Sequence, residues 1–395
     1  MSQEGSVKAM LQQGGVKAPL EEPSAKPTAE FNFRGLLEKM IELDASDLHL
    51  KVGSHPVFRV HGALQTDTSY PKTTKEIVAA IVEKIVPAQL KENLKRDGAV
   101  DFGFSIDANN RFRTNAFLQR SAYSIALRRL GYEHLSFEEL NLPPITKRIA
   151  DSRYGMVLLT GPTGCGKSTT MAAMLHHVNQ TRSCHIITIE DPIEFIHRDI
   201  KSIIDQREMG IDARTFDQAL RHAMREDPDV ILIGEMRDQE TVNIAIRAAM
   251  TGHLILSTTH TISAVQTVNR VLKFFPVEIH PTIRSDLALA LKAVLTQRLI
   301  PGADGRSRIP AVEVMIVNDM IRKLIREDRI DDMIQVMRNR VDGMQSFDQS
   351  LLDQVKKNLI TPQVAVEYAD DPATFRRNLA GAFAGTDRSS LVGSF

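Results

Sequence analysis

The chain has 395 residues, 43% of them hydrophobic, and its 49 basic and 49 acidic residues give a formal net charge of zero. This length predicts about two domains, and the absence of a positive field argues against a nucleic-acid partner. Cys165 and Cys184 are the only cysteines, which excludes a disulfide framework and fits a reducing cytoplasm. No apolar run approaches the roughly 20 residues of a membrane span, so we expect no direct membrane insertion.

The first 135 residues divide into a polar tail and an α+β domain. Residues 1–30 are rich in Gly, Gln, Pro and Lys and are predicted to be disordered. Residues 31–135 then show patterns typical of a short helix, a hairpin, further helices and a second hairpin, which predicts an α+β domain. The segments that carry these patterns are 36–41, 48–64, 73–95 and, for the second hairpin, 100–106 with 111–119.

Two arginines share one face of the second predicted hairpin. Arg111 and Arg113 are two residues apart, so in a strand they point the same way, whereas Phe112, Ala116 and Leu118 occupy the opposite, apolar face. Neighbouring arginines on an open face can clamp a phosphate. A solvated polar face is the plainer interpretation, and the residues alone favour it.

A linker precedes the second domain. The sequence Leu-Asn-Leu-Pro-Pro at 140–144 breaks any regular element. We place the boundary within 130–145, with the second domain covering 136–379. Beyond Tyr154 apolar runs alternate with helical patterns, which is typical of a parallel α/β sheet.

A phosphate-binding motif follows the first apolar run of this domain. The run 156–160 is typical of a strand buried on both faces, and the residues after Ser168 have helical spacing without Pro or Gly. Strand, glycine loop and helix are the context that G-x-x-x-x-G-K-S requires, since backbone N–H groups and a helix N-terminus attract phosphate. Lys167 is expected to reach the β- and γ-phosphates and Ser168 to hold Mg²⁺. The predicted nucleotide-binding residues are Gly161, Pro162, Thr163, Gly164, Cys165, Gly166, Lys167, Ser168 and Thr169.

Polar residues follow three further predicted strands. The strands 185–189, 229–233 and 253–258 are followed by Glu190, Glu235 and His260. Because ligands bind beyond the carboxyl ends of the strands in open α/β sheets, these side chains are expected at the same crevice as the phosphate loop. The convergence predicts catalysis.

Each of these polar residues has a catalytic and a plainer interpretation. Hydrolysis of a γ-phosphate needs charge neutralisation and an oriented water. Glu235 is expected to assist Mg²⁺ through water, which leaves Glu190 as the base, although either can instead cap a helix or form a surface ion pair. His260 is a candidate sensor of the γ-phosphate or a polar residue satisfied by a loop. A zinc site is disfavoured because no C-x-x-C occurs.

The rest of the chain is predicted to be helical. Thr215-x-x-Gln218 and Ser346-x-x-Gln349 are predicted capping boxes. Residues 319–379 show amphipathic helical patterns, and 380–395 are predicted to be disordered.

Several blocks resemble one family. Residues 187–195 (Ile-Thr-Ile-Glu-Asp-Pro-Ile-Glu-Phe) resemble the Asp box of secretion and type IV pilus ATPases, 227–238 their Walker B segment, and 251–261 their His box. Within this superfamily the chain is most similar to the retraction type, PilT and PilU. The segments that carry this narrower resemblance are Ala-Ser-Asp-Leu-His-Leu at 45–50 and Met-Ile-Arg-Lys-Leu-Ile-Arg-Glu at 320–327.

The resemblance implies an α/β architecture and a set of roles. It implies a PAS-like N-terminal α+β domain, a RecA-like P-loop ATPase domain with C-terminal helices, and a homohexamer that uses ATP and Mg²⁺. It makes Glu190 the catalytic glutamate, Glu235 the Walker B residue and His260 the γ-phosphate sensor. The residues expected to reach over the nucleotide from the N-terminal domain are Arg111, Arg113 and Arg128.

The function implied is an ATP-hydrolysing motor for type IV pilus retraction and twitching motility. Its partners would be an inner-membrane pilus platform protein and a paralogous retraction ATPase, at the cytoplasmic face of the inner membrane. The alternatives are a pilus assembly or type II secretion ATPase of the same fold, or an accessory PilU-like subunit. A helicase is disfavoured by the zero net charge and the lack of a base-stacking aromatic cluster.

Overall fold

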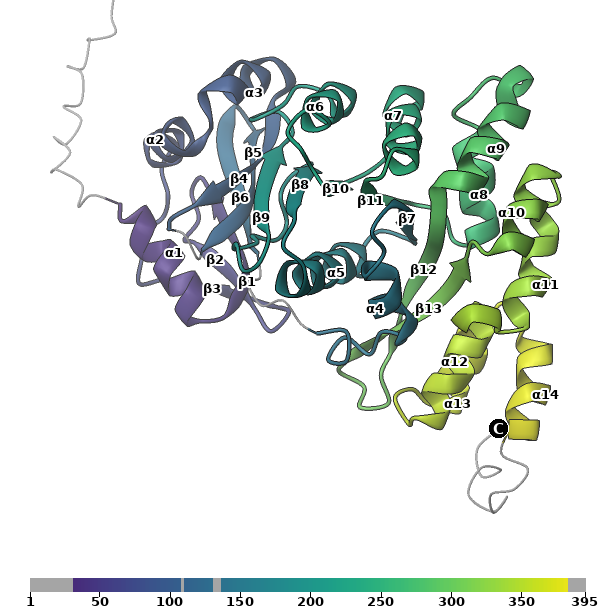
Figure 1. Ribbon diagram of the computed structural model, residues 1–395. Helices are drawn as coiled ribbons and strands as arrows, with labels where there is room; N and C mark the ends of the chain where they lie inside the picture. The colour runs from purple at the N-terminus through teal and green to yellow at the C-terminus, as the bar shows by residue number, and fades with distance from the viewer. Residues whose placement is uncertain (1–30, 108–109, 131–135, 383–395) are drawn as a thin grey trace, which may run out of the picture.

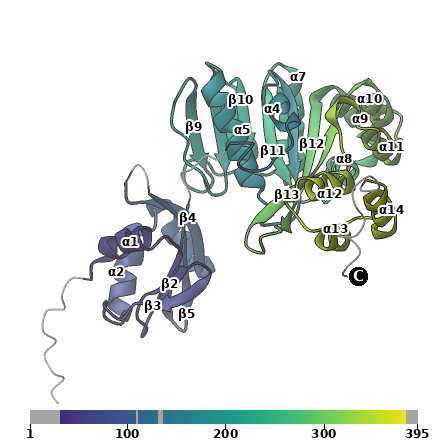
Figure 2. The same ribbon diagram turned by 90° about the horizontal axis from the view of Figure 1, so that it is seen from below.

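The computed structural model describes residues 31–107, 110–130 and 136–382, and these form two β-sheets, one of six strands and one of seven. The N-terminal sheet and its helices form one domain, coloured purple to blue in Figure 1. The second sheet, with helices on both faces, forms the larger domain, and Figure 2 shows the two side by side. The predicted α/β architecture is confirmed.

The N-terminal sheet is antiparallel and has the strand order β3-β2-β1-β6-β5-β4. One face packs on helices whose apolar residues recur at helical spacing, and α1 begins where the Asn32 side chain accepts a hydrogen bond from the backbone N–H of Gly35. The elements of this domain are α1 (Phe33–Glu42), β1 (Ala45–Lys51), β2 (Val57–Val60), β3 (Ala63–Thr66), α2 (Lys75–Ile85), α3 (Lys91–Asp97), β4 (Ala99–Ser105), β5 (Arg111–Gln119) and β6 (Ala122–Arg129).

The sheet of the larger domain has the strand order β13-β12-β7-β11-β10-β8-β9. The strands from β12 to β9 run parallel, and β13 is antiparallel to β12. The strand bounds are β7 (Gly155–Thr160), β8 (His185–Glu190), β9 (Ile203–Glu208), β10 (Val230–Ile233), β11 (Leu254–Thr259), β12 (Leu291–Pro301) and β13 (Arg308–Ile316).

Side chains alternate between two apolar layers of this sheet. Val157 and Leu159 of β7 pack toward α4 and α5, whereas Met156 and Leu158 pack toward the helices of the opposite face. Both sets are buried, and burying a side chain of this kind stabilises the fold by about 1.5–3 kcal/mol. The helices on the two faces are α4 (Ile145–Ala150) and α5 (Lys167–Thr181) on one, and α6 (Phe216–Ala223), α7 (Gln239–Met250), α8 (Ala264–Leu272), α9 (His280–Ala290), α10 (Asp319–Arg326) and α11 (Met333–Arg338) on the other.

The C-terminal helices cover the end of the β12–β13 hairpin. They are α12 (Phe347–Lys356), α13 (Pro362–Tyr368) and α14 (Pro372–Ala382). The predicted capping box at Ser346 and Gln349 is present. In the predicted box at Thr215, which lies within the described range 136–382, the threonine side chain makes no cap hydrogen bond, so that prediction was wrong.

The structure adds strands that the sequence pattern did not predict. β6 lies inside the N-terminal sheet between β1 and β5, and β9, β12 and β13 extend the larger sheet at its two ends. Leu118, expected on the apolar face of β5, is 46% exposed because it lies near the end of that strand. The first predicted tail, 1–30, lies outside the described residues. The second was placed too early, because α14 continues to residue 382, and 383–395 lie outside the described residues.

The described residues contain no helix that is both long and apolar enough to cross a bilayer. In the same part of the chain no group of three or more His, Cys, Asp or Glu side chains is placed to hold a metal ion.

Candidate active site

A cleft of about 690 Å³ lies at the carboxyl ends of the parallel strands. The phosphate loop forms one wall, the residues after β8, β10 and β11 form another, and the N-terminal sheet contributes arginines. Among the residues predicted from the sequence, the ones that line this cleft are Thr163, Gly164, Gly166, Lys167, Ser168, Thr169, Glu190, Glu235, His260, Arg113 and Arg128.

The phosphate loop connects the buried strand β7 to α5. Gly161, Gly164 and Gly166 have φ of 138°, 78° and 89°, which residues with a side chain rarely adopt. Lys167 is the first residue of α5, and its ammonium donates hydrogen bonds to the carbonyl oxygens of Gly161 at 2.8 Å and Pro162 at 3.2 Å. The positive charge is thus held against the loop, where phosphate oxygens would bind.

Gln297 of β12 forms hydrogen bonds with the phosphate loop and with the first turn of α5. Its amide nitrogen donates to the carbonyl oxygen of Cys165 at 2.6 Å, and its amide oxygen accepts from the hydroxyl of Thr170 at 2.9 Å. A Cβ atom on Gly161 would lie 2.3 Å from the carbonyl oxygen of Gln297, so only glycine fits there. Gln297 is 2% exposed, and both ends of its amide are used. It holds the loop on the sheet.

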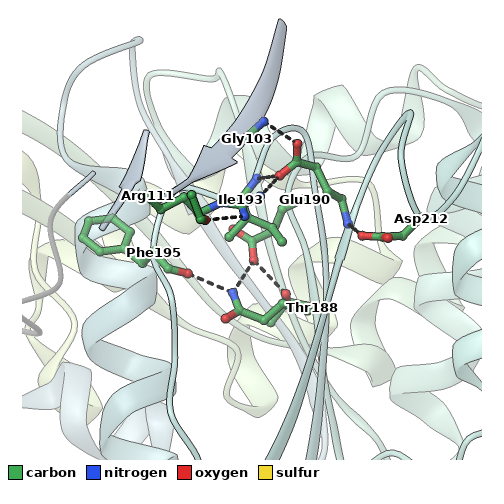
Figure 3. A network of polar contacts seen from close by, with 10 residues as sticks. Gly103, Arg111, Thr188, Glu190, Ile193, Phe195 and Asp212 are labelled. Carbon is green, nitrogen blue, oxygen red and sulfur yellow. Dashed lines mark hydrogen bonds and ion pairs between the residues drawn. The ribbon is translucent and has the colours of Figure 1, made fainter. Parts of the chain in front are cut away.

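Glu190 is the last residue of β8 and is half-buried in the cleft wall. Its carboxylate accepts hydrogen bonds from the hydroxyl of Thr188 at 2.7 Å and from the amide of Gln206 at 3.2 Å (Figure 3). Burial raises the pKa of Glu190 from 4.5 to about 7, partly opposed by these hydrogen bonds, while the nearby Glu194 raises it further. A carboxyl with a pKa near neutrality suits a general base.

Glu235 and His260 lie together in the same wall of the cleft as Glu190. The Nε2 atom of His260 is 3.1 Å from the carboxylate of Glu235, and the Nε of Arg237 donates to the same carboxylate at 2.8 Å. The Thr258 hydroxyl donates to the carbonyl oxygen of Gly234 at 2.6 Å and joins the ends of β10 and β11. Glu235 therefore lies between two basic side chains in the lining of the cleft.

Arg113 and Arg128 come from neighbouring strands of the N-terminal sheet. They are directly paired across β5 and β6, and Arg128 is in turn opposite Asp47 of β1. Arg128 donates to Asp47 at 2.9 Å, and Arg113 lies 3.7 Å from Glu194 of the larger domain. The arginine-bearing face of the hairpin, for which the sequence allowed either a phosphate clamp or a solvated surface, thus lines the cleft.

Arg111 is placed differently from Arg113. It is not among the described residues that line the cleft, and its guanidinium instead pairs with Glu208 at the end of β9. The structure thus divides the predicted arginines into two that reach the cleft and one that joins the domains beside it.

Sequence reasoning missed Gln297, Gln206, Glu208 and Arg237. The first three lie on β12 and β9, strands that the pattern did not predict, and their partners are up to 132 residues away. Arg237 had a local signal, because it lies two residues after Glu235.

Comparisons with known proteins identify the family of the chain. A family model described as type II/IV secretion system protein matches residues 22–365. The twitching motility protein of Neisseria gonorrhoeae is 43% identical over 317 residues, 80% of this chain and 84% of that protein. The type IV pilus retraction ATPase PilT of Pseudomonas aeruginosa is 43% identical over 332 residues, 84% of this chain and 96% of that protein. The crystal structure of the pilus retraction motor PilT with bound ADP matches with a TM-score of 0.81 and 40% identity, over 87% of this chain and 99% of that one.

Replacing Gln297 should weaken nucleotide binding. In Gln297→Leu the Cys165 carbonyl and the Thr170 hydroxyl lose a buried partner, and we expect Kd for ADP to rise on the order of tenfold, since each such loss costs about 1–3 kcal/mol. Titration calorimetry with ADP measures this. Gln345→Leu, which removes a similar 2.6 Å bond to the carbonyl oxygen of Val312, is the control. Equal Kd values for Gln297→Leu and the wild type would contradict the role of Gln297.

Hydrolysis should depend on the ionisation of Glu190. Because the base acts in its charged form, the rate should rise with pH through about 7. Thr188→Val removes a donor that favours the carboxylate, so the pKa rises and the midpoint should move to higher pH by about one pH unit, the effect of ~1.5 kcal/mol. A pH profile of phosphate release tests this, and a midpoint that stays or moves to lower pH would exclude Glu190 as the titrating group.

Proposed function

The chain belongs to the family of type II/IV secretion system proteins, and we propose that it is a hexameric ATP-hydrolysing motor that powers type IV pilus retraction. The observation that carries the proposal is the single cleft in which the phosphate loop, Glu190, Glu235, His260 and arginines of a second domain meet. The two relatives of 43% identity, named for twitching motility and pilus retraction, support retraction as the work that this cleft drives.

The phosphate loop supplies binding and charge neutralisation. Backbone N–H groups of the loop and the N-terminus of α5 take the phosphates, and Lys167 turns from the loop carbonyls toward the β- and γ-phosphates. The Ser168 hydroxyl and the Glu235 carboxylate both line the cleft and are hard oxygen donors that fit Mg²⁺. Ser168 and, through water, Glu235 would hold Mg²⁺, which would supply positive charge toward the phosphates.

The remaining groups act on the transferred phosphate. Glu190 accepts a proton from the attacking water, because it is the cleft carboxyl whose pKa lies near 7 and it projects from the strand next to β10. His260, paired with Glu235, contacts the γ-phosphate and reports its loss. Arg113 and Arg128 bring positive charge from the N-terminal sheet, so hydrolysis is tied to the position of that domain.

The assembly follows from the same family resemblance. We propose a homohexamer at the cytoplasmic face of the inner membrane, acting on a pilus platform protein and working beside a paralogous retraction ATPase. Closure of the N-terminal domain over the nucleotide would be the step that produces force.

Two variants separate binding from hydrolysis in the purified chain. Glu190→Gln should keep ADP affinity within about twofold of wild type and lose phosphate release by on the order of 100-fold, the effect of a general base. Lys167→Ala should lose both. Glu278→Gln, an exposed carboxyl outside the cleft, is the control. Normal hydrolysis by Glu190→Gln would show that another group is the base.

The direction of the motor is tested in cells. A strain carrying Lys167→Ala should show excess surface pili and no twitching motility, because pili assemble but are not withdrawn. Electron microscopy and a surface motility assay measure both, with Lys147→Ala, an exposed lysine on α4, as the control. Loss of pili would instead indicate an assembly ATPase, and unchanged piliation and motility an accessory subunit.

A further inference from the structure

Glu208 is a buried carboxylate at the junction of the two domains. It ends β9 and its side chain is 2% exposed. It accepts a hydrogen bond from the backbone N–H of Gly103 of β4 at 2.7 Å and pairs with the guanidinium of Arg111 of β5, whose side chain is 17% exposed. Figure 3 shows Gly103 and Arg111 in this network, both from the N-terminal sheet. One carboxylate thus holds two adjacent strands of the other domain.

The fit around Glu208 leaves no room for a side chain at position 103. A Cβ atom on Gly103 would lie 2.6 Å from a carboxylate oxygen of Glu208 and 2.1 Å from a guanidinium nitrogen of Arg111. The missing side chain allows the backbone N–H to reach the carboxylate. The N-terminal domain is therefore held against the larger domain by two contacts with the Glu208 carboxylate, the ion pair with Arg111 and the hydrogen bond from the Gly103 backbone.

The same carboxylate contacts the loop that follows the catalytic glutamate. Glu208 accepts from the backbone N–H of Ile193 at 3.4 Å. Glu190 and Glu208 are paired in register on the parallel strands β8 and β9, and the backbone N–H of Met209 donates to the carbonyl oxygen of Glu190 at 2.8 Å. The loop after Glu190 is thus held at its start by β9.

Gln206 completes the link to the base. It lies two residues before Glu208, on the same face of β9. Its amide nitrogen donates to the carboxylate of Glu190 at 3.2 Å and to the carbonyl oxygen of Phe195 at 2.8 Å. β9 therefore contacts the N-terminal domain through Glu208 and the catalytic glutamate through Gln206.

Because Arg111 and Glu208 are buried, breaking their ion pair costs much more free energy than breaking an exposed ion pair. A buried carboxylate that loses its cation is strongly destabilised, because its charge is then neither paired nor hydrated. The exposed pairs of this interface, such as Arg113 with Glu194, carry no comparable penalty because water replaces the partner. Glu208 therefore contacts both the N-terminal domain and the loop after Glu190, so a movement of one affects the other.

We propose that Arg111 and Glu208 are positioning residues that couple the seating of the N-terminal domain to the placement of Glu190 for hydrolysis. This rests on the proposed ATPase function and assigns Arg111 to the loop that carries the base rather than to the nucleotide. The pair acts through Gln206 and the Ile193 backbone and touches neither phosphate nor water in the reaction.

The test compares variants of the full chain by steady-state phosphate release and by ADP titration. Arg111→Ala and Glu208→Gln should each lower kcat on the order of tenfold, the effect of a small misplacement of a catalytic group, with KM and ADP affinity within about twofold of wild type. The double variant should lose no more than either single variant, since both break one contact. Arg111→Lys, which keeps the charge, should recover part of kcat.

The control lies on the same strand. Arg207 points to the opposite face of β9 and pairs with Glu226 at 3.1 Å, so Arg207→Ala should leave kcat unchanged. Gly103→Ala, which disturbs the same contact without removing a charge, should reproduce the loss in kcat if Glu208→Gln fails to fold. Losses that multiply in the double variant, or equal losses in ADP affinity, would overturn the proposal. A wild-type chain without ATP turnover would instead contradict the proposed function.

Discussion

The strands β7, β11, β10 and β8 run parallel and in register, and their carboxyl ends meet at one edge of the sheet. β7 leads into the phosphate loop, β8 ends at Glu190, and the residues after β10 and β11 are Glu235 and His260. Each strand is buried on both faces, so a slip of register would exchange the side chains that fit the two closely packed apolar layers, and this packing determines the register. Packing alone thus brings Glu190, Glu235 and His260 beside the loop.

The strands on either side of these four, β12 and β9, hold the loops of the cleft. β12 carries Gln297, which anchors the phosphate loop, and β9 carries Gln206 and Glu208, which contact Glu190 and the N-terminal domain. The strands β8, β10 and β11 position the polar residues of the cleft, whereas β12 and β9 contact the loops that line it. The N-terminal sheet then adds Arg113 and Arg128 at the open side of the cleft.

The predictable part of the site was local in sequence. The phosphate loop, Glu190, Glu235 and His260 each follow an apolar run, so a strand and its terminal residue are visible together. The family and the α/β fold that these blocks indicated are confirmed. Gln297 and Glu208 could not be found this way, because Gln297 contacts Cys165, 132 residues away in the chain, and Glu208 contacts Gly103, 105 residues away. Arg111 and Arg113 share a face, and only the position of Glu208 decides which of them remains beside the cleft.

Glu190 and Glu208 are the last residues of the neighbouring strands β8 and β9 and are paired in register, but the groups that contact their carboxylates differ. Glu208 has a guanidinium partner and two backbone N–H donors, which are strong charge-assisted contacts. Within the described part of the chain no ion pair reaches Glu190, whose partners are a hydroxyl and an amide, and burial raises its pKa to about 7. Glu208, paired with Arg111 and hydrogen-bonded to the backbone of Gly103, holds the two domains together. Glu190, whose pKa burial raises, is positioned by its neighbours Thr188 and Gln206. Glu190 is therefore placed by contacts of β9, the strand whose last residue is Glu208.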